Sequence, residues 1–161
     1  MRPFLEKLPV IPGASWSLLN RRLDEGIPFE WHHHPEYELT LTLNSKGQRF
    51  IGDHVGEYED GDLVLVGANL PHTWASRARL DPTLPHVALV MWFRHEWAQA
   101  LGEGFAELRP IAGLVARGRG RARFFTRGGG ARPADDRGSV RSGPARALSG
   151  IGSRASGAGG G

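Results

Sequence analysis

The stretch WHHHPEYELTLTL, residues 31–43, places three histidines and two glutamates before a regular alternation of leucine and threonine. Alternation with a period of two predicts a β-strand with one apolar and one polar face. His32, His34 and Glu38 occupy even positions, so a single strand through this stretch would carry all three on its polar face. That face is either exposed to solvent or the wall of a polar pocket. His33 points to the opposite side by the same parity and is expected to lie outside the pocket.

A second stretch, GDLVLVGANLPH at residues 61–72, brings a further histidine about one hairpin later. Residues 69–71 predict a tight bend, which fixes the direction from which His72 approaches His32, His34 and Glu38. Three imidazoles and a carboxylate together suit a zinc, iron, nickel or manganese ion. Solvated histidines beside a surface carboxylate are the alternative interpretation. The predicted metal ligands are His32, His34, Glu38 and His72.

Short strands broken by turn residues are predicted from about residue 15 to residue 93. Eight short strands at this spacing favour an all-β fold, an antiparallel sandwich or barrel. We therefore assign residues 1–94 to a single β-barrel domain. The predicted strands are residues 16–23, 29–33, 37–44, 48–51, 54–58, 62–66, 72–76 and 86–93.

Helical periodicity replaces the strand pattern in residues 95–118. Residues 96–101 predict a short helical turn, and an amphipathic helix is predicted over Ala106–Arg117, with Pro110 in its first turn. The apolar positions of this helix either cover the barrel or pair two copies of the chain as a homodimer. These positions are Leu108, Ile111, Leu114 and Val115.

The formal net charge of +3 combines two parts of opposite sign. Residues 1–117 carry 11 Lys and Arg against 15 Asp and Glu, a difference of −4, whereas residues 118–161 carry 9 Arg against 2 Asp, a difference of +7. The basic part is rich in Gly, Arg, Ala and Ser and has too few apolar residues to offset the entropy of ordering it. We predict a disordered tail over residues 119–161. The abrupt change of composition also suggests that this tail is an out-of-frame continuation of a longer protein.

Composition excludes several other classes of protein. The chain has no cysteine, which excludes disulfides and thiolate metal sites. Residues 1–7 contain charges and a proline where a signal peptide needs an apolar run. The longest apolar run, residues 87–93, is too short to span a bilayer. These features predict a soluble, cytoplasmic protein with no membrane partner.

The two stretches resemble the two motifs of the cupin superfamily, whose fold is a jelly-roll barrel, also called a double-stranded β-helix. The first motif has a His-x-His pair, a Glu and a turn Gly; the second has a Gly followed at a set spacing by a His. Gly67 and Asn69 stand where Pro and Gly are usual in the second motif. The residues that match are His32, His34, Glu38, Gly47, Gly61 and His72.

The resemblance is closer to one group of cupins, the N-terminal sensor domain of AraC-type transcription regulators, and covers about residues 10–118. It implies a small-molecule effector, a sugar or a small organic acid, in the mouth of the barrel. It also implies a C-terminal domain that binds DNA through two helix-turn-helix units. The low-complexity tail stands where that domain would begin, so no sequence-specific DNA binding is expected of this chain alone. The matching segments are residues 31–39, 52–54, 61–65 and 69–74, with residues 106–118 similar to the linker helix.

Polar and aromatic side chains near the motifs suit such an effector. Imidazole, carboxylate and hydroxyl groups hydrogen-bond its hydroxyls, and aromatic faces pack on its C–H faces. A tryptophan in a small barrel is alternatively a core residue, and His54, His86 and His95 stand alone and are expected to be structural or solvated. The expected ligand-binding residues are His32, His34, Glu38, Thr40, His72, Trp31, Tyr37 and Trp74.

A metal-dependent cupin enzyme of the dioxygenase, isomerase or epimerase type is the alternative function. A divalent ion held by the four predicted ligands would leave positions open for oxygen or substrate. The sequence offers only Glu36 and Tyr37 as nearby general acids or bases. We therefore expect sensing rather than catalysis, with one divalent metal ion as the possible cofactor.

Overall fold

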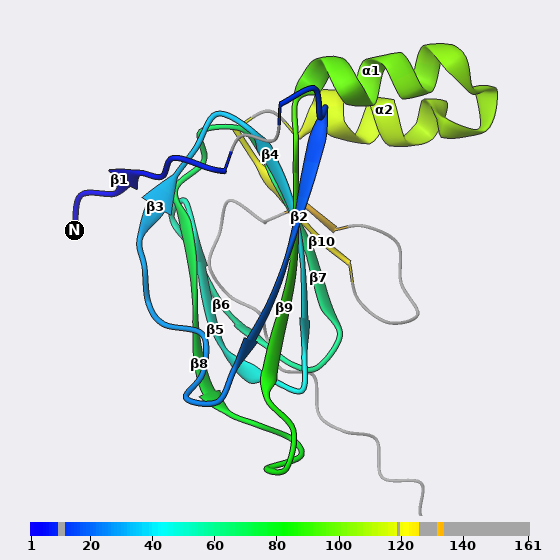
Figure 1. The fold of residues 1–161 in the computed structure, drawn as a ribbon. Helices are drawn as coiled ribbons and strands as arrows, with labels where there is room; N and C mark the ends of the chain where they lie inside the picture. The colour runs from blue at the N-terminus through cyan, green and yellow to red at the C-terminus, as the bar shows by residue number, and fades with distance from the viewer. Residues whose placement is uncertain (10–11, 119, 126–131, 134–161) are drawn as a thin grey trace, which may run out of the picture.

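The computed structural model describes residues 1–9, 12–118, 120–125 and 132–133, whose strands form two sheets that face each other (Figure 1). The first sheet has the strand order β1-β3-β8-β5-β6, and the second has the order β11-β10-β7-β4-β9-β2. All pairings are antiparallel except that of β1 with β3. The described part of the chain is thus mostly β-structure, as the sequence predicts.

All eight strands expected from the sequence are present, and four of them have the expected bounds. The first sheet contains β1 (Phe4–Leu5), β3 (His32–His33), β8 (His72–Ala78), β5 (Lys46–Ile51) and β6 (His54–Tyr58). The second contains β11 (Arg132–Pro133), β10 (Ala122–Phe125), β7 (Asp62–Val66), β4 (Tyr37–Leu43), β9 (His86–Phe93) and β2 (Trp16–Leu23). The helices are α1 (His95–Gly104), the short 3-10 helix η1 (Ala106–Leu108) and α2 (Arg109–Arg117).

The polar face of β4 points into the space between the sheets. Glu38, Thr40 and Thr42 are buried, and in the register of β4 with β9 they lie opposite Trp92, Val90 and Ala88, which are also buried. The leucines that alternate with them lie on the outer face of the sheet and are only partly buried. Of the two interpretations of this strand, the wall of an interior polar pocket is therefore the one observed.

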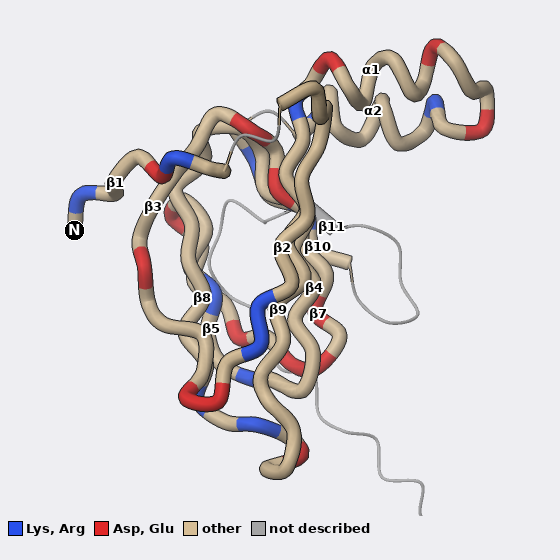
Figure 2. Tube along the Cα trace, in the orientation of Figure 1, with Lys and Arg blue, Asp and Glu red and all other residues tan. Residues whose placement is uncertain are grey.

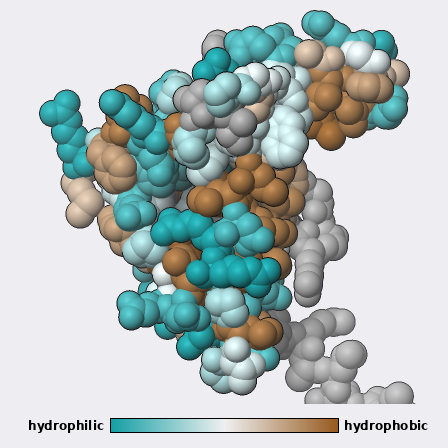
Figure 3. Space-filling view, in the orientation of Figure 1, coloured by the Kyte–Doolittle hydropathy of each residue, from teal (hydrophilic) through white to brown (hydrophobic). Residues whose placement is uncertain are grey.

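The helices cover one end of the outer face of the second sheet. Val115 is buried in a cluster with Tyr37, Leu65, Phe93 and Ala98, and Leu114 packs against this cluster. Ile111 is 50% exposed, and Figure 3 shows apolar side chains gathered on the surface of the two helices. The amphipathic pattern therefore serves partly to cover the sheet, which was one of its two predicted roles.

Strand β10 corrects the prediction that disorder begins at residue 119. It pairs with β7 in the register Ala122 to Val66 and Phe124 to Val64. Ala122 and Phe124 point into the core and are both buried. The strand is therefore stabilised both by its hydrogen bonds to β7 and by the burial of these two apolar side chains. The remainder of the predicted tail, residues 126–131 and 134–161, lies outside the described residues.

Turn residues adopt the backbone angles that their types allow. Ile51 and His54 face each other across a two-residue turn, in which Gly52 has a φ of 61°. This is the conformation that favours glycine at the first central position of a tight hairpin.

The surface of the described chain carries charges of both signs on strands, loops and helices (Figure 2). None of its helices is long and apolar enough to cross a bilayer.

Candidate metal centre and ligand cavity

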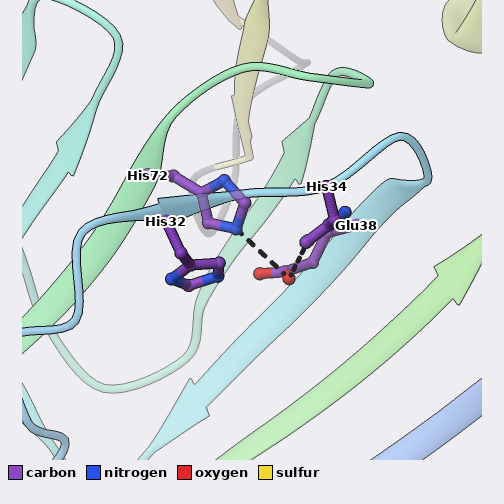
Figure 4. A group of neighbouring side chains, drawn as sticks. All are labelled: His32, His34, Glu38 and His72. Atoms are coloured by element: carbon purple, nitrogen blue, oxygen red, sulfur yellow. Dashed lines mark hydrogen bonds and ion pairs between the residues drawn. The ribbon is translucent and has the colours of Figure 1, made fainter. Parts of the chain in front are cut away.

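Four predicted ligands meet between the two sheets (Figure 4). One ligand atom from each of His32, His34, Glu38 and His72 lies within 4.8 Å of the others. His32 and His72 are cross-strand partners on β3 and β8, whereas Glu38 comes from β4 in the facing sheet. The prediction of one strand through the first three residues was wrong, because the chain turns between His33 and Tyr37 and passes from one sheet to the other.

The carboxylate of Glu38 is the centre of the cluster. Its Oε2 atom accepts a hydrogen bond of 2.8 Å from the indole N–H of Trp92 and lies 3.1 Å from His34 Nε2 and 3.3 Å from His72 Nε2. Its Oε1 atom accepts a hydrogen bond of 2.6 Å from the hydroxyl of Thr40. The side chain is nearly inaccessible to solvent, so these contacts replace the water that an ionised carboxylate requires.

Backbone carbonyls fix how two of the histidines face the cluster. His32 donates from Nδ1 to the carbonyl of Glu30 at 2.6 Å, and His72 donates from Nδ1 to the carbonyl of Leu70 at 2.8 Å. Each ring therefore presents Nε2 to the interior. A hydrogen bond on the far nitrogen is the arrangement that orients metal-binding imidazoles.

The electrostatics of the cluster keep Glu38 ionised. Burial alone would raise the pKa of Glu38, but the charge of His72 and hydrogen bonds from His34, His72 and Thr40 hold it well below its usual value. Burial alone would lower the pKa of His72, but the charge and hydrogen bond of Glu38 raise it. The pKa of His32 is lowered by burial and by the charge of His72. Neutral His32 and anionic Glu38 are the states that bind a metal cation.

Two separations between donor atoms match those expected around a divalent ion. Two ligand atoms at about 2.1 Å from one metal are about 3.0 Å apart at a right angle and about 3.4 Å apart at the tetrahedral angle. The separations of 3.1 Å and 3.3 Å between Glu38 Oε2 and the two imidazole nitrogens fall in that range. The cluster can hold a metal ion, and its mixture of nitrogen and oxygen donors is compatible with zinc, iron, nickel or manganese.

A cavity of about 70 Å³ adjoins the cluster between the sheets. Two of its lining residues, Thr42 and Trp74, carry a buried polar group that has no hydrogen-bond partner among the described residues, the hydroxyl and the indole N–H. Buried polar groups in proteins are nearly always paired, with protein, water or ligand. The lining residues are Glu6, Leu19, Arg21, Ile27, Pro28, Glu30, His32, Glu38, Thr40, Thr42, Thr73, Trp74, Ala88, Val90 and Trp92.

Four of the eight expected ligand-binding residues do not line this cavity: His34 and His72, which belong to the adjoining cluster, and Tyr37 and Trp31. Tyr37 faces the other side of its sheet, where its ring stacks on Phe93 with centroids 5.7 Å apart. Trp31 lies beside β3 and does not line the cavity. Glu36, the other acid–base candidate, approaches His34 Nδ1 only at 3.9 Å and lies outside the cavity.

The remaining histidines lie apart from the cluster. His33 does not line the cavity, and neither does His34, although parity predicts opposite orientations for the two. His86 is buried at the other end of the sheets, where its Nδ1 lies 2.9 Å from the hydroxyl of Ser45. The rings of His54 and His95 lie against Phe124 and Tyr37.

Sequence reasoning missed Trp92, Thr42 and Glu6. Trp92 lies within the apolar run of residues 87–93, where nothing distinguishes it from a core residue. Thr42 continues the even parity of Glu38 and Thr40, which is a signal that could have identified it. Glu6 lies 26 positions before His32 in the chain, and only tertiary structure brings them together.

No protein-family model matches this chain, and no curated protein sequence matches it significantly.

Proposed function

We propose that this chain is a small-molecule sensor domain with a cupin-type jelly-roll barrel, related to the N-terminal domains of AraC-type regulators. The observation that carries the proposal is the polar cavity between the sheets. Thr40, Thr42 and Glu38 turn the polar face of β4 inward, where a purely structural barrel would place apolar side chains. The convergence of His32 and His72 with Glu38 in the adjoining cluster supports the cupin assignment.

The cavity favours a small hydroxylated effector. A water molecule needs about 10–15 Å³ of such volume, so 70 Å³ corresponds to about five waters or a ligand of about six non-hydrogen atoms. A three-carbon hydroxy acid or polyol is closer to this size than a pentose. The unpaired indole N–H of Trp74 can donate to such a ligand, and the hydroxyl of Thr42 can donate or accept.

Replacing Thr42 with valine is expected to weaken effector binding while leaving the fold intact. Valine keeps the shape of threonine but removes the hydroxyl that has no partner in the protein. Losing a buried hydrogen bond to the effector would weaken binding by about 1–3 kcal/mol, about 5- to 150-fold. The measurement is a thermal-shift screen of polyols, pentoses, hexoses and small hydroxy acids against the metal-loaded chain.

Thr83→Val provides the control, because Thr83 lies in an exposed loop away from the cavity. A compound that stabilises the wild type and the Thr83→Val variant equally, but not the Thr42→Val variant, supports the sensor proposal. A compound that stabilises all three proteins equally binds elsewhere and argues against this cavity as its site.

A small metalloenzyme is the second candidate function, favoured by the metal-binding geometry of the cluster. A metal ion bound there would supply Lewis-acid chemistry next to the cavity. Glu6 and Glu30, at the edge of the cavity, could exchange protons with a bound ligand. Any compound that the screen identifies should be incubated with the metal-loaded chain and followed by NMR. Unchanged compound supports sensing, whereas conversion that disappears in a His34→Ala variant supports catalysis.

A further inference from the structure

We propose that Glu6 supplies a second carboxylate to the metal centre, so that the complete ligand set is three imidazoles and two carboxylates. This inference rests on the metal-binding part of the proposed function. Glu6 is remote from both sequence motifs and comes from the N-terminal segment that pairs with β3.

Backbone hydrogen bonds fix Glu6 beside the cluster. Strand β1 runs parallel to β3, with the N–H of Phe4 donating to the carbonyl of Trp31 at 3.2 Å. The N–H of Glu6 then donates to the carbonyl of His33 at 3.0 Å, which continues this pairing one step past the strand. The ring of Phe4 lies against that of His32, with centroids 5.7 Å apart. The backbone of Glu6 is thereby held next to His32.

The side chain of Glu6 reaches the metal-facing nitrogen of His32. Glu6 Oε2 lies 3.2 Å from His32 Nε2. The other nitrogen of this ring is already bonded to the carbonyl of Glu30, so Nε2 is the atom available to a metal. This separation of 3.2 Å is that of an ion pair, and it also lies between the values of about 3.0 Å and 3.4 Å expected of two neighbouring ligands on one ion. It also matches the separations that Glu38 makes with His34 and His72. Glu6 is not one of the four residues whose ligand atoms all lie within 4.8 Å of one another, so its carboxylate would move toward the ion when the metal binds.

Charge gives a second reason for Glu6 to bind the ion. Three neutral imidazoles and Glu38 alone would leave one positive charge on a divalent ion between the sheets, and a buried net charge is costly. A second carboxylate neutralises it. Glu30, the other glutamate at the edge of the cavity, lies 3.8 Å from Arg21 and is partly neutralised there.

The test compares metal binding by the wild type, Glu6→Gln and Glu57→Gln full-length chains. Glutamine keeps the size of the side chain and removes its charge. Affinities for Zn²⁺ are measured by competition with a chromophoric chelator, and the visible spectrum of bound Co²⁺ reports the coordination number. We expect Glu6→Gln to weaken binding about 10- to 100-fold and to change the Co²⁺ spectrum. Glu57→Gln, at an exposed residue that pairs with Arg77 on the surface, is expected to match the wild type in both measurements.

Each of the other outcomes counts against the inference in a different way. Equal affinities and spectra for the wild type and Glu6→Gln would overturn it while leaving the four-residue centre intact. A weaker affinity with an unchanged Co²⁺ spectrum would make Glu6 a positioning residue for His32 rather than a ligand. A wild-type chain that binds neither metal would refute the metal centre itself. Circular dichroism of each variant confirms that the compared chains are folded.

Discussion

Replacing Glu38 with alanine is expected to destabilise the metal-free chain by about 3–5 kcal/mol, the cost of removing one partner from a buried ionic network. The carboxylate accepts from Trp92 and Thr40 and faces the Nε2 atoms of His34 and His72, and all these contacts are lost together. A small domain is stable by only about 5–15 kcal/mol, so this is a large fraction of the total. Urea denaturation in the presence of a chelator measures the effect without any contribution from metal.

Glu38→Gln separates the loss of charge from the loss of contacts. Its amide oxygen can still accept from one of the four neighbours, so we expect a smaller loss of stability, with metal affinity still strongly reduced. Glu57→Ala is the control, because Glu57 is exposed and pairs with Arg77 on the surface, where an ion pair contributes about 0–1 kcal/mol. A Glu38→Ala variant as stable as Glu57→Ala would contradict the role of Glu38 as the centre of the cluster.

Replacing Asp62 with alanine is expected to lower the free energy of unfolding by an amount near the lower end of about 3–5 kcal/mol. Asp62 lies at the end of the sheets away from the metal centre. Arg49 donates from Nη1 to Asp62 Oδ1 at 2.9 Å, and both side chains are close to 90% buried. The guanidinium also lies 4.3 Å from the ring centre of Phe124. Without Asp62, Arg49 keeps its charge in a site that is only partly solvated. Urea denaturation again provides the measurement.

The Arg49→Met/Asp62→Leu double variant should recover most of this loss, because apolar residues can replace a buried pair without leaving a charge. Burial raises the pKa of Asp62 above its ordinary 3.8, although Arg49 opposes the shift. The folded wild type therefore retains this proton to a higher pH than the unfolded chain does. The free energy of unfolding of the wild type, relative to that of the double variant, should be greatest below pH 3.8. It should fall as the pH rises through the raised pKa of Asp62. A double variant as unstable as Asp62→Ala, or a difference independent of pH, would contradict this account.

The sequence was sufficient to predict the strands, because they depend on local patterns. Strict alternation specifies β4, and regularly spaced turn residues specify its neighbours. His32, His34, Glu38 and His72 do converge, although the argument from one strand was wrong. The histidines and Glu38 meet because β3 and β4 lie on facing sheets, and sequence parity carries no information about which strands face each other.

The features that could not be predicted depend on long-range pairing. Glu6 lies 26 residues before His32 and Trp92 lies 20 residues after His72, so only tertiary structure brings them to the cluster. Strand β10 was assigned to the tail because composition outweighed the short alternation of Ala122 and Phe124. Tyr37 was expected at the cavity because it is adjacent to Glu38, but adjacent residues of a strand face opposite sides.

Elemental analysis of the purified chain after dialysis against zinc, iron, nickel and manganese salts, followed by removal of free metal, tests the central claim most directly. The wild type and the His32→Ala/His72→Ala variant are compared by plasma mass spectrometry. We expect about one metal ion per wild-type chain, because His32, His34, Glu38 and His72 form one centre, and little metal in the variant. No retained metal in the wild type, or equal amounts in both proteins, would contradict the metal centre and leave only the polar cavity as a candidate site.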